Sequence, residues 1–276
     1  MAIETSNEPV AFSEFENSGW DEVSAAYALY FGPLTDQSTS VMMESARVRP
    51  GSRFLDVCTG PGMLAEEAAR IGADVSGVDF SEEALTIAQR NVPEASFHQG
   101  DAQDLPFEEN SFDSVACGFG IIHVPDPQKA LQEMYRVLKP GGQVALSIWE
   151  APTPANGFGL VYSSIKTHGD LSVPLPHGPD FFQFSDETRL SEVLRLSGFS
   201  GISVKTAEQN WDFLDPSELV RCITDSTVRA RALLSAQTES NRRNIIEAVI
   251  TGIENFCSDD GTYRVPMHAL VGSGTK

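Results

Sequence analysis

Apolar and polar residues follow two different periods between residues 53 and 149. Five short apolar runs have the character of buried strands, and the segments between them space their apolar residues as amphipathic helices do. The predicted strands are RFLDVC, ADVSGVDF, ASFHQGD, FDSVACGFG and QVALSIW. Buried strands that alternate regularly with helices predict an α/β fold, a parallel sheet with helices on both faces.

Two of the intervening helices carry clear start signals. Ser81 precedes Glu82 and Glu83, and Asp126 precedes Pro127. Ser and Asp are preferred N-caps, and acidic residues or proline are favoured in the first turn. Ligands of such sheets bind beyond the carboxyl ends of the strands. We therefore expect the functional site near Gly60, Asp79, Asp101 and Phe119.

The flanks of this core follow other patterns. Residues 1–18 are polar and are expected to be frayed. Two late segments, GISVKTAEQNWDFL and TYRVPMHALVGSGTK, are each predicted to form one strand. We expect a single domain over 1–276, made of N-terminal helices at 19–48, a core at 50–150 and a segment at 151–276 with a helical insertion at 215–258 that can roof the strand ends.

Composition excludes several classes of partner. Of the 276 residues, 41% are hydrophobic and 21% charged, as in ordinary globular proteins. The net charge is −20, and the sequence has no basic cluster of the kind that binds the phosphates of nucleic acid. Nucleic acid is therefore not an expected partner. The four cysteines show no Cys-x-x-Cys spacing, which favours a reducing compartment and no metal site. Without a basic leader or a long apolar run, we expect a soluble, cytoplasmic protein that does not insert into membranes. No pattern predicts an oligomeric state.

Gly60 and Gly62 lie between the first predicted strand and a helix. Glycine at such a turn allows positive φ and close approach of a ligand, and the helix start offers unpaired N–H groups. With Ala65, the two glycines match the Gly-x-Gly-x-x-Gly/Ala pattern of dinucleotide-binding folds. A tight turn without a ligand would have the same pattern.

Two aspartates at the ends of the next strands narrow the choice of ligand. Asp79 lies 17 residues after Gly62, where a carboxylate can accept hydrogen bonds from both hydroxyls of a ribose. The candidates are therefore NAD, FAD and adenosyl compounds without a phosphate on that ribose. Asp101, in GDAQDLPF, either presents its carboxylate to a purine edge or is a turn residue.

Four sequence blocks in this order resemble the class I S-adenosylmethionine-dependent methyltransferases, in particular the small-molecule group with the ubiquinone and menaquinone biosynthesis enzymes. The blocks are LDVCTGPG, VSGVDFS, QGDAQDLPFEENSFDSVACGFGIIHVPDP and ALQEMYRVLKPGGQVALSIW. The resemblance implies a Rossmann-like, doubly wound, mostly parallel seven-stranded sheet with an antiparallel last strand and helical cap elements. It also implies S-adenosyl-L-methionine as cofactor and in-line methyl transfer to a small, aromatic or apolar metabolite.

The resemblance also implies which residues contact the cofactor. Gly60 and Gly62 are expected along the methionine part, with Asp56 anchoring their loop, and Cys117, Gly118 and Phe119 on the same side of the cofactor. Asp79 is expected at the ribose, and Phe80, Asp101 and Ala102 around the adenine. Tyr27 is expected to cover the site. Cys58 departs from the pattern, since the family usually has glycine there. Its side chain is expected to point away from the cofactor or to shift the loop slightly.

His123, in FGIIHVPDP, is the candidate general base. It follows the fourth predicted strand, and a base assists methyl transfer when the acceptor is a hydroxyl. The alternative is a structural histidine that orders the loop. Aromatic residues favour a flat or apolar acceptor. We expect its site to be built from Trp20, Tyr27 and Tyr30, the segment 155–184 with Phe181, Phe182 and Phe184, and the insertion with Trp211.

Two other functions stay open at this point. One is a protein that binds S-adenosylmethionine without methyl transfer, such as a regulator or an enzyme of the cyclase kind. The other is a nicotinamide-dependent oxidoreductase, which the spacing Tyr162-x-x-x-Lys166 suggests. The Thr-Gly-x-x-x-Gly-x-Gly pattern of short-chain dehydrogenases is not met at residues 59–66.

Overall fold

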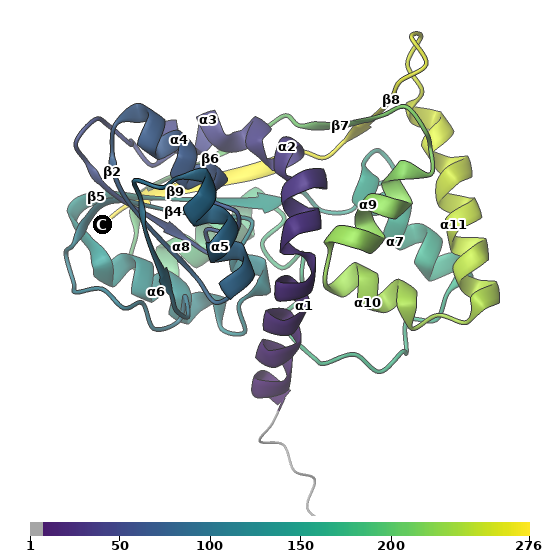
Figure 1. Cartoon of the computed structure of the whole chain (residues 1–276), viewed down its shortest axis with the longest axis horizontal. Coiled ribbons are helices and arrows are strands. Elements are labelled where there is room, and N and C mark those ends of the chain that lie inside the picture. The colour runs from purple at the N-terminus through teal and green to yellow at the C-terminus, as the bar shows by residue number, and fades with distance from the viewer. Residues whose placement is uncertain (1–7) are drawn as a thin grey trace, which may run out of the picture.

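The structure, a computed structural model, describes residues 8–276 and centres on a seven-stranded sheet (Figure 1). The strand order is β3-β2-β1-β4-β5-β9-β6. Its strands are β1 (Arg53–Val57), β2 (Asp74–Asp79), β3 (Ser96–Gln99), β4 (Phe112–Gly118), β5 (Leu138–Trp149), β6 (Ser200–Ala207) and β9 (Ala269–Thr275).

The first five strands run parallel, whereas β9 is antiparallel to both of its neighbours, β5 and β6. One strand of the seven is therefore reversed. This confirms the expected fold class, a doubly wound and mostly parallel sheet with an antiparallel last strand. The carboxyl ends of β1, β2 and β4 meet on one edge, because the three strands are hydrogen-bonded neighbours.

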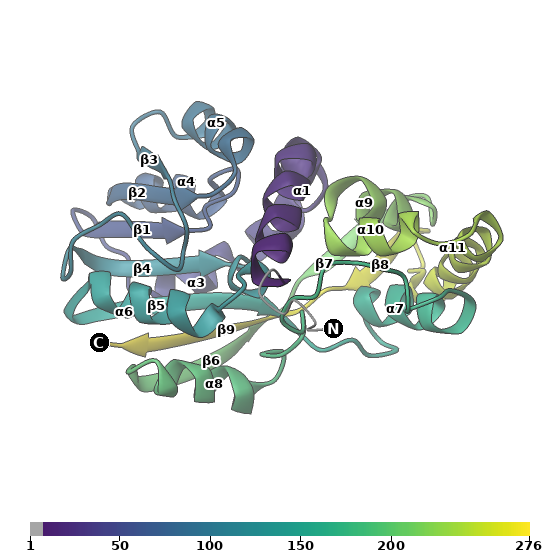
Figure 2. The ribbon, with the colours of Figure 1, turned by 90° about the horizontal axis from the view of Figure 1, so that it is seen from below.

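Helices cover both faces of the sheet (Figure 2). Helix α4 packs on β1 and β2, α5 on β2 and β3, α3 on β5 and β9, α6 on β5, and α8 on β6 and β9. These helices are α3 (Thr39–Ser45), α4 (Met63–Ile71), α5 (Glu82–Asn91), α6 (Pro127–Val137) and α8 (Glu187–Leu196).

Both predicted N-caps are confirmed. Ser81 Oγ accepts a hydrogen bond from the Ala84 N–H at 3.1 Å, at the start of α5. Asp126 Oδ1 accepts one from the Lys129 N–H at 3.0 Å, at the start of α6. These bonds satisfy N–H groups that have no partner within their own helices.

The long helix α1 (Glu8–Tyr30) overturns the expectation of a frayed start. Residues 8–18 belong to this helix, and Phe12 and Glu16 are almost fully buried within it. Residues 1–7 of that prediction lie outside the described residues. Helix α1 stands between the sheet and the helices of the second half (Figure 1). A hydrogen bond of 2.6 Å from Ser81 Oγ to Asp21 Oδ1 ties it to the end of β2.

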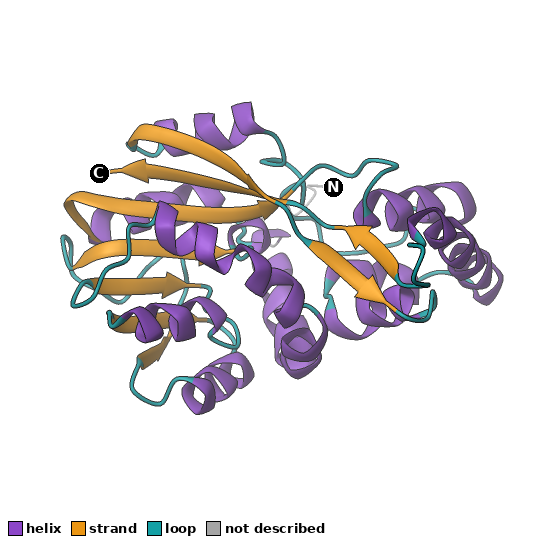
Figure 3. Cartoon of the chain, turned by 90° about the horizontal axis from the view of Figure 1, so that it is seen from above, coloured by secondary structure: helices purple, strands orange, loops and turns teal. Residues whose placement is uncertain are grey.

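Both late strands were predicted too long. The first divides into β6 and β7 (Asn210–Phe213), and the second into β8 (Tyr263–Pro266) and β9. Strands β7 and β8 form a separate two-stranded sheet (Figure 3). Buried Gln209 bonds to Met267 at the division, where its backbone oxygen accepts from the Met267 N–H and its side chain donates to the Met267 oxygen.

The remaining helices form a cap beside α1 (Figure 1). Within it, α7 packs against α11, and α9 contacts α1. The cap helices are α7 (Gly157–His168), α9 (Glu218–Ser226), α10 (Arg229–Ser235) and α11 (Glu239–Ile253); the short elements are α2 (Gly32–Thr35), η1 (Asp36–Ser38), η2 (Ile121–His123) and η3 (Glu254–Phe256). Over residues 8–276, none of these helices combines the length and apolar character that crossing a bilayer would require.

Candidate functional site

The turn after β1 has backbone conformations suited to glycine. Gly60 has a φ of 54° and Gly62 a φ of 90°, and Gly62 begins α4. A Cβ on Gly62 would also crowd Ala88 of α5, so the residue serves helix packing as well as the turn. Cys58 has a φ of 55°, which is rare for a residue with a side chain. Its side chain packs against Gly120, where any Cβ would overlap it.

Asp79, at the end of β2, holds this turn closed. Its Oδ2 accepts the Gly60 N–H and its Oδ1 accepts the Ser81 N–H, both at 2.9 Å. Burial raises the pKa of the Asp79 carboxyl, although the backbone hydrogen bonds oppose the shift. The carboxylate thus links the glycine turn to the start of α5, and it retains lone pairs for a ligand.

Asp56 lies beneath the same turn and is 1% exposed. It accepts a hydrogen bond from Thr59 Oγ1 at 2.7 Å. Burial raises the pKa of the Asp56 carboxyl to about 7, a shift that the Thr59 bond opposes and Asp79 reinforces. The folded protein therefore holds this proton more tightly than the unfolded chain does.

Replacing Asp56 by asparagine is expected to weaken the pH dependence of stability. The stabilising proton on Asp56 is fully present below about pH 4 and is lost as the pH rises through about 7. Asp56→Asn should therefore reduce the loss of unfolding free energy between pH 5 and pH 8 by roughly 2–3 kcal/mol. Urea unfolding at both pH values measures this, with Asp74→Asn at the exposed start of β2 as control. An unchanged pH dependence in Asp56→Asn would contradict the assignment.

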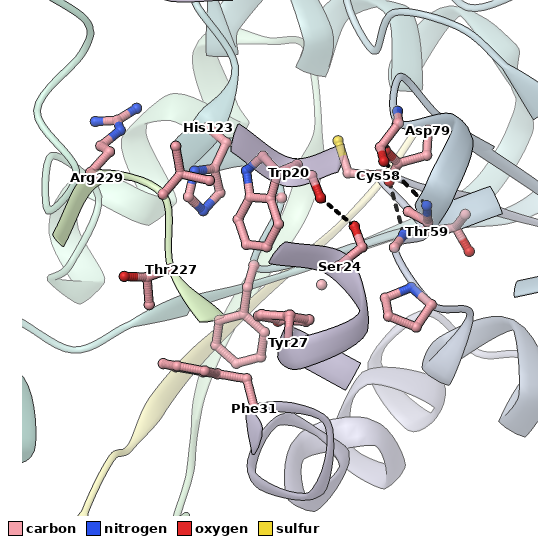
Figure 4. A pocket seen from close by; sticks show the side chains of 18 of the residues that line it. Trp20, Ser24, Tyr27, Phe31, Cys58, Thr59, Asp79, His123, Thr227 and Arg229 are labelled. Atoms are coloured by element: carbon pink, nitrogen blue, oxygen red, sulfur yellow. Dashed lines mark hydrogen bonds between the residues drawn. The ribbon is translucent and has the colours of Figure 1, made fainter. Parts of the chain in front are cut away.

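A main cavity of about 980 Å³, partly open to solvent, lies beyond the strand ends. Figure 4 shows Cys58 and Asp79 on one side of it and His123 and Arg229 on the other, with Trp20 between. Ten of its 25 lining residues carry aromatic rings. The lining rings are Trp20, Tyr27, Phe31, Phe80, Phe119, His123, Trp149, Phe158, Tyr162 and Phe181.

Two smaller pockets adjoin the main cavity. The hydroxyl pocket, about 340 Å³, is lined by Thr35, Ser38, Thr39, Asp56, Thr59, Ser147 and neighbouring residues. The Asp101 pocket, about 590 Å³, is lined by Ser13, Glu16, Asn17, Asp79, Phe80, Asp101, Ala102, His123 and neighbouring residues. Cys58 borders all three spaces, so it stands where they meet.

Phe119, after β4, is a second residue of this site with a strained backbone. Its φ is 58°, and its ring stacks on Trp149 with centroids 4.1 Å apart. Non-glycine residues with positive φ persist where the surroundings hold them, and such residues cluster at functional sites. Cys58 and Phe119 both border the main cavity and the hydroxyl pocket.

His123 belongs to a buried polar cluster with Glu16 and Arg229. Its Nδ1 lies 2.9 Å from Glu16 Oε2, and Arg229 Nε donates to Glu16 Oε1 at 2.5 Å. The Glu16 side chain is 1% exposed. Burial raises its pKa, but the charges and hydrogen bonds of His123 and Arg229 outweigh burial and lower the pKa of the Glu16 carboxyl. Glu16 is therefore ionised at neutral pH.

The structure brings most of the predicted cofactor residues to the walls of these three spaces. Gly62 and Cys117 are the exceptions: neither is part of a described pocket wall, and Cys117 is fully buried. Those at the walls are Tyr27, Asp56, Cys58, Gly60, Asp79, Phe80, Asp101, Ala102, Gly118 and Phe119. His123, the predicted base, also lies at the walls.

The predicted acceptor residues divide into two groups. Trp20, Tyr27 and Phe181 line the main cavity. Tyr30 and Trp211 instead line a separate surface groove between α1, β7 and α9. Phe182 packs behind Phe158 and Phe181, and Phe184 is also part of the surrounding core.

Several wall residues were not found from the sequence. Glu16 and Asn17 fell in the segment expected to be frayed, and no prediction named Phe31 or Trp149 as wall residues. Arg229 lies far away in the chain, so no local pattern marked it. Phe158 and Tyr162 belong to the segment 155–184 that was expected at the acceptor site, but neither was named for it; Lys166, which is spaced with Tyr162, is exposed and outside the lining.

Sequence comparison connects this site to known proteins. Residues 55–146 match the family described as "Methyltransferase domain". A demethylmenaquinone methyltransferase of Staphylococcus carnosus is 35% identical over 180 residues, which cover 60% of this chain and 75% of that protein. One of Listeria welshimeri is 48% identical over 112 residues, covering 37% of this chain and 47% of that protein.

Solved structures share the fold. The YcgJ protein of Bacillus subtilis aligns with a TM-score of 0.56 at 22% identity, covering 87% of this chain and 97% of that one. Phosphoethanolamine N-methyltransferase 2 of Haemonchus contortus, in complex with phosphomonomethylethanolamine and S-adenosylhomocysteine, aligns with a TM-score of 0.59 at 20% identity, covering 96% and 60%. The glycine turn, Asp79 at the end of β2 and the reversed strand β9 agree with these matches. This chain belongs to the class I S-adenosylmethionine-dependent methyltransferases.

Proposed function

We propose that this S-adenosylmethionine-dependent methyltransferase methylates a small, flat, largely apolar metabolite held in the main cavity. The aromatic wall of that cavity carries the proposal. Rings bury large areas and prefer edge or offset contacts with another ring, so such a wall favours a flat acceptor. The names of the demethylmenaquinone methyltransferase relatives favour a quinone-type or phenolic acceptor.

The residues present fit the cofactor. Thr39 and Ser147 line the hydroxyl pocket, and Asn17 lines the Asp101 pocket. Among the described residues, the side-chain oxygens of all three are buried without a hydrogen-bond partner. Buried polar atoms are nearly always bonded, so unpaired ones at pocket walls suit a ligand that completes them. We assign the methionine part to the hydroxyl pocket and the adenine to the Asp101 pocket.

We assign the sugar to Asp79, which borders both the main cavity and the Asp101 pocket. Phe80 is assigned to the adenine face, and Asp101 with the Ala102 N–H to the adenine edge. The Asp101 carboxylate is already bonded to the N–H and side-chain amide of Gln103, which orients it. Gly62 and Cys117 act indirectly, through the turn and the packing beneath it.

S-adenosylmethionine, when bound, supplies an electrophilic methyl group on a sulfonium. The task of the chain is then to align the acceptor atom, to exclude water and, where the acceptor carries a proton, to remove it. Trp20, Phe158 and Phe181 can sandwich and align a flat ring. Among the wall residues we assign proton removal to His123.

A screen with S-adenosylmethionine labelled in its methyl group tests the proposed function. Phenols, quinols, heteroaromatic hydroxyls and small amines are offered to the purified protein, and the products are read by mass spectrometry. Label on a flat aromatic acceptor supports the proposal. Cofactor binding with no transfer to any acceptor would favour a binding protein, and transfer only to small polar amines would contradict the acceptor class.

Replacing Phe158 by alanine is expected to weaken acceptor binding selectively. Its ring is 6% exposed and contacts the rings of Trp149 and Phe181. Losing this apolar surface removes about 1.5–3 kcal/mol, so the KM for the acceptor should rise tenfold or more. Calorimetry should show unchanged cofactor affinity. Tyr135→Ala, an aromatic residue outside the cavity that pairs with Phe199, is the control.

A further inference from the structure

One nitrogen of the His123 ring is engaged and the other is free. Nδ1 is bonded to Glu16, whereas Nε2 makes no hydrogen bond to any residue from 8 to 276. The ring stands edge-on to Trp20, at 4.9 Å between centroids, and to Phe181, at 5.5 Å. His123 also borders both the main cavity and the Asp101 pocket. The aromatic neighbours therefore hold the ring plane, and Nε2 is the ring nitrogen not engaged by Glu16.

Glu16 determines which nitrogen carries the proton. Its carboxylate accepts from Trp20 Nε1 at 3.1 Å in addition to its bonds with Arg229 and His123. An ionised carboxylate only accepts hydrogen bonds, so the Nδ1 of a neutral His123 ring must be the donor. Nε2 then holds a lone pair and is the basic nitrogen.

Arg229 holds Glu16 in this position from the cap. Its guanidinium also donates to the backbone oxygens of Pro179, at 2.8 Å, and Ile122, at 3.0 Å. The guanidinium thus joins α10, the segment before Phe181 and the loop that carries His123. Arg229 bonds Glu16 and these two backbone oxygens, so its role in the cluster is to hold Glu16 in place.

The other titratable groups around the cavity are poorly suited to remove a proton. Burial raises the pKa of Tyr27 and of Tyr162 to about 12 in each case. A hydrogen bond with Cys117, together with burial, raises the pKa of Cys58. Asp79 is occupied by two backbone N–H groups. The charged or titratable groups that line these spaces with His123 are Glu16, Tyr27, Cys58, Asp79, Asp101, Tyr162 and Arg229.

We infer that Glu16 is a positioning residue that makes His123 Nε2 a general base for a hydroxylated acceptor. This inference rests on the proposed function and adds to it the kind of atom that is methylated. It assigns the reaction to O-methylation of a phenol-type hydroxyl that is largely protonated at neutral pH. A base at this position is useful when the acceptor atom carries a proton that must leave during transfer, as the oxygen of a phenol does.

The O–H bond of the acceptor breaks and its proton passes to Nε2 of His123. The new O–CH₃ bond forms as the S–CH₃ bond of the sulfonium breaks, and the bonding pair stays on sulfur, which becomes a neutral thioether. The imidazolium that results is stabilised by Glu16 and later releases its proton to water. No oxidant or second reactant is required.

Nitrogen NMR of the wild-type protein gives a test that needs no acceptor. With the histidine side chains labelled with ¹⁵N, and the signal assigned by its loss in His123→Gln, neutral His123 should show a protonated Nδ1 and a bare Nε2. Glu16→Gln should change this tautomer balance, whereas Glu22→Gln, on the exposed side of the same helix, should not. A wild-type ring protonated only at Nε2 would overturn the inference.

Acceptors of graded acidity give the kinetic test. With a weakly acidic phenol, Glu16→Gln and His123→Gln should each lower kcat about 10²-fold or more, with little change in acceptor KM or cofactor affinity. With a nitrophenol that is already ionised at the assay pH, both variants should approach the wild-type rate.

The outcomes separate the two proposals. Equal losses for ionised and protonated acceptors would show a structural role and overturn this inference, while the methyl transfer itself would support the proposed function. Full activity of His123→Gln on the weak phenol would also overturn it. Absence of any transfer by the wild type would instead refute the proposed function, and the tautomer measurement would still decide whether Glu16 orients His123.

Discussion

Replacing Arg229 by methionine is expected to lower the free energy of unfolding by about 3–5 kcal/mol, the usual cost of breaking a buried ion pair. The Glu16 side chain is 1% exposed and that of Arg229 is 17% exposed, so water would not readily replace the lost guanidinium. The two backbone oxygens that Arg229 now satisfies would lose a donor as well. Chemical denaturation of the purified variant measures the effect.

Arg231 provides the matched control, two positions further along α10. It pairs with Glu22 of α1 at 3.0 Å, but both side chains are well exposed. Exposed pairs contribute about 0–1 kcal/mol, so Arg231→Met should be close to wild type. The double variant Glu16→Gln with Arg229→Met should lose less than the sum of its single changes, because no charge is left without a partner. Equal effects of Arg229→Met and Arg231→Met would contradict the buried cluster.

Asp79→Ala is expected to weaken S-adenosylmethionine binding by about 2–4 kcal/mol, or roughly 30- to 1,000-fold. Loss of the sugar contacts accounts for part of this, at about 1–3 kcal/mol for a buried polar group left unpaired. The remainder comes from the Gly60 and Ser81 N–H groups, which lose their acceptor, so that the glycine turn must be ordered on binding.

Isothermal calorimetry measures this change, with Asp74→Ala as control. Asp74 lies at the opposite, exposed end of the same strand and should leave the affinity unchanged. Asp79→Asn should fall between the two, since it retains one carbonyl oxygen as acceptor. Wild-type affinity in Asp79→Ala would remove the residue from the cofactor site and with it the placement of the sugar.

The elements that the sequence predicts well are those whose signals are local. The caps at Ser81 and Asp126 act within three residues, and the apolar runs of the parallel strands are unmistakable because both faces are buried. The glycine turn and Asp79 are also marked by local signals, because each lies at the end of a predicted strand. The two strands are neighbours in the parallel sheet, so a site at their carboxyl ends could be predicted as well.

The elements that the sequence hides depend on tertiary contacts. Glu16 lies in a polar segment that the sequence predicts to be frayed. A buried charge is stable there only because Arg229 and His123 are brought to it from more than 100 residues away. The division of each late strand depends on Gln209 and Met267, which satisfy one another across the break. No local periodicity marks either case.

Helix α1 is a shared wall, because Trp20 and Tyr27 border the main cavity while Glu16 and Asn17 border the Asp101 pocket. A ligand in either space would therefore contact the same helix, so a substitution that shifts α1 should alter both spaces at once.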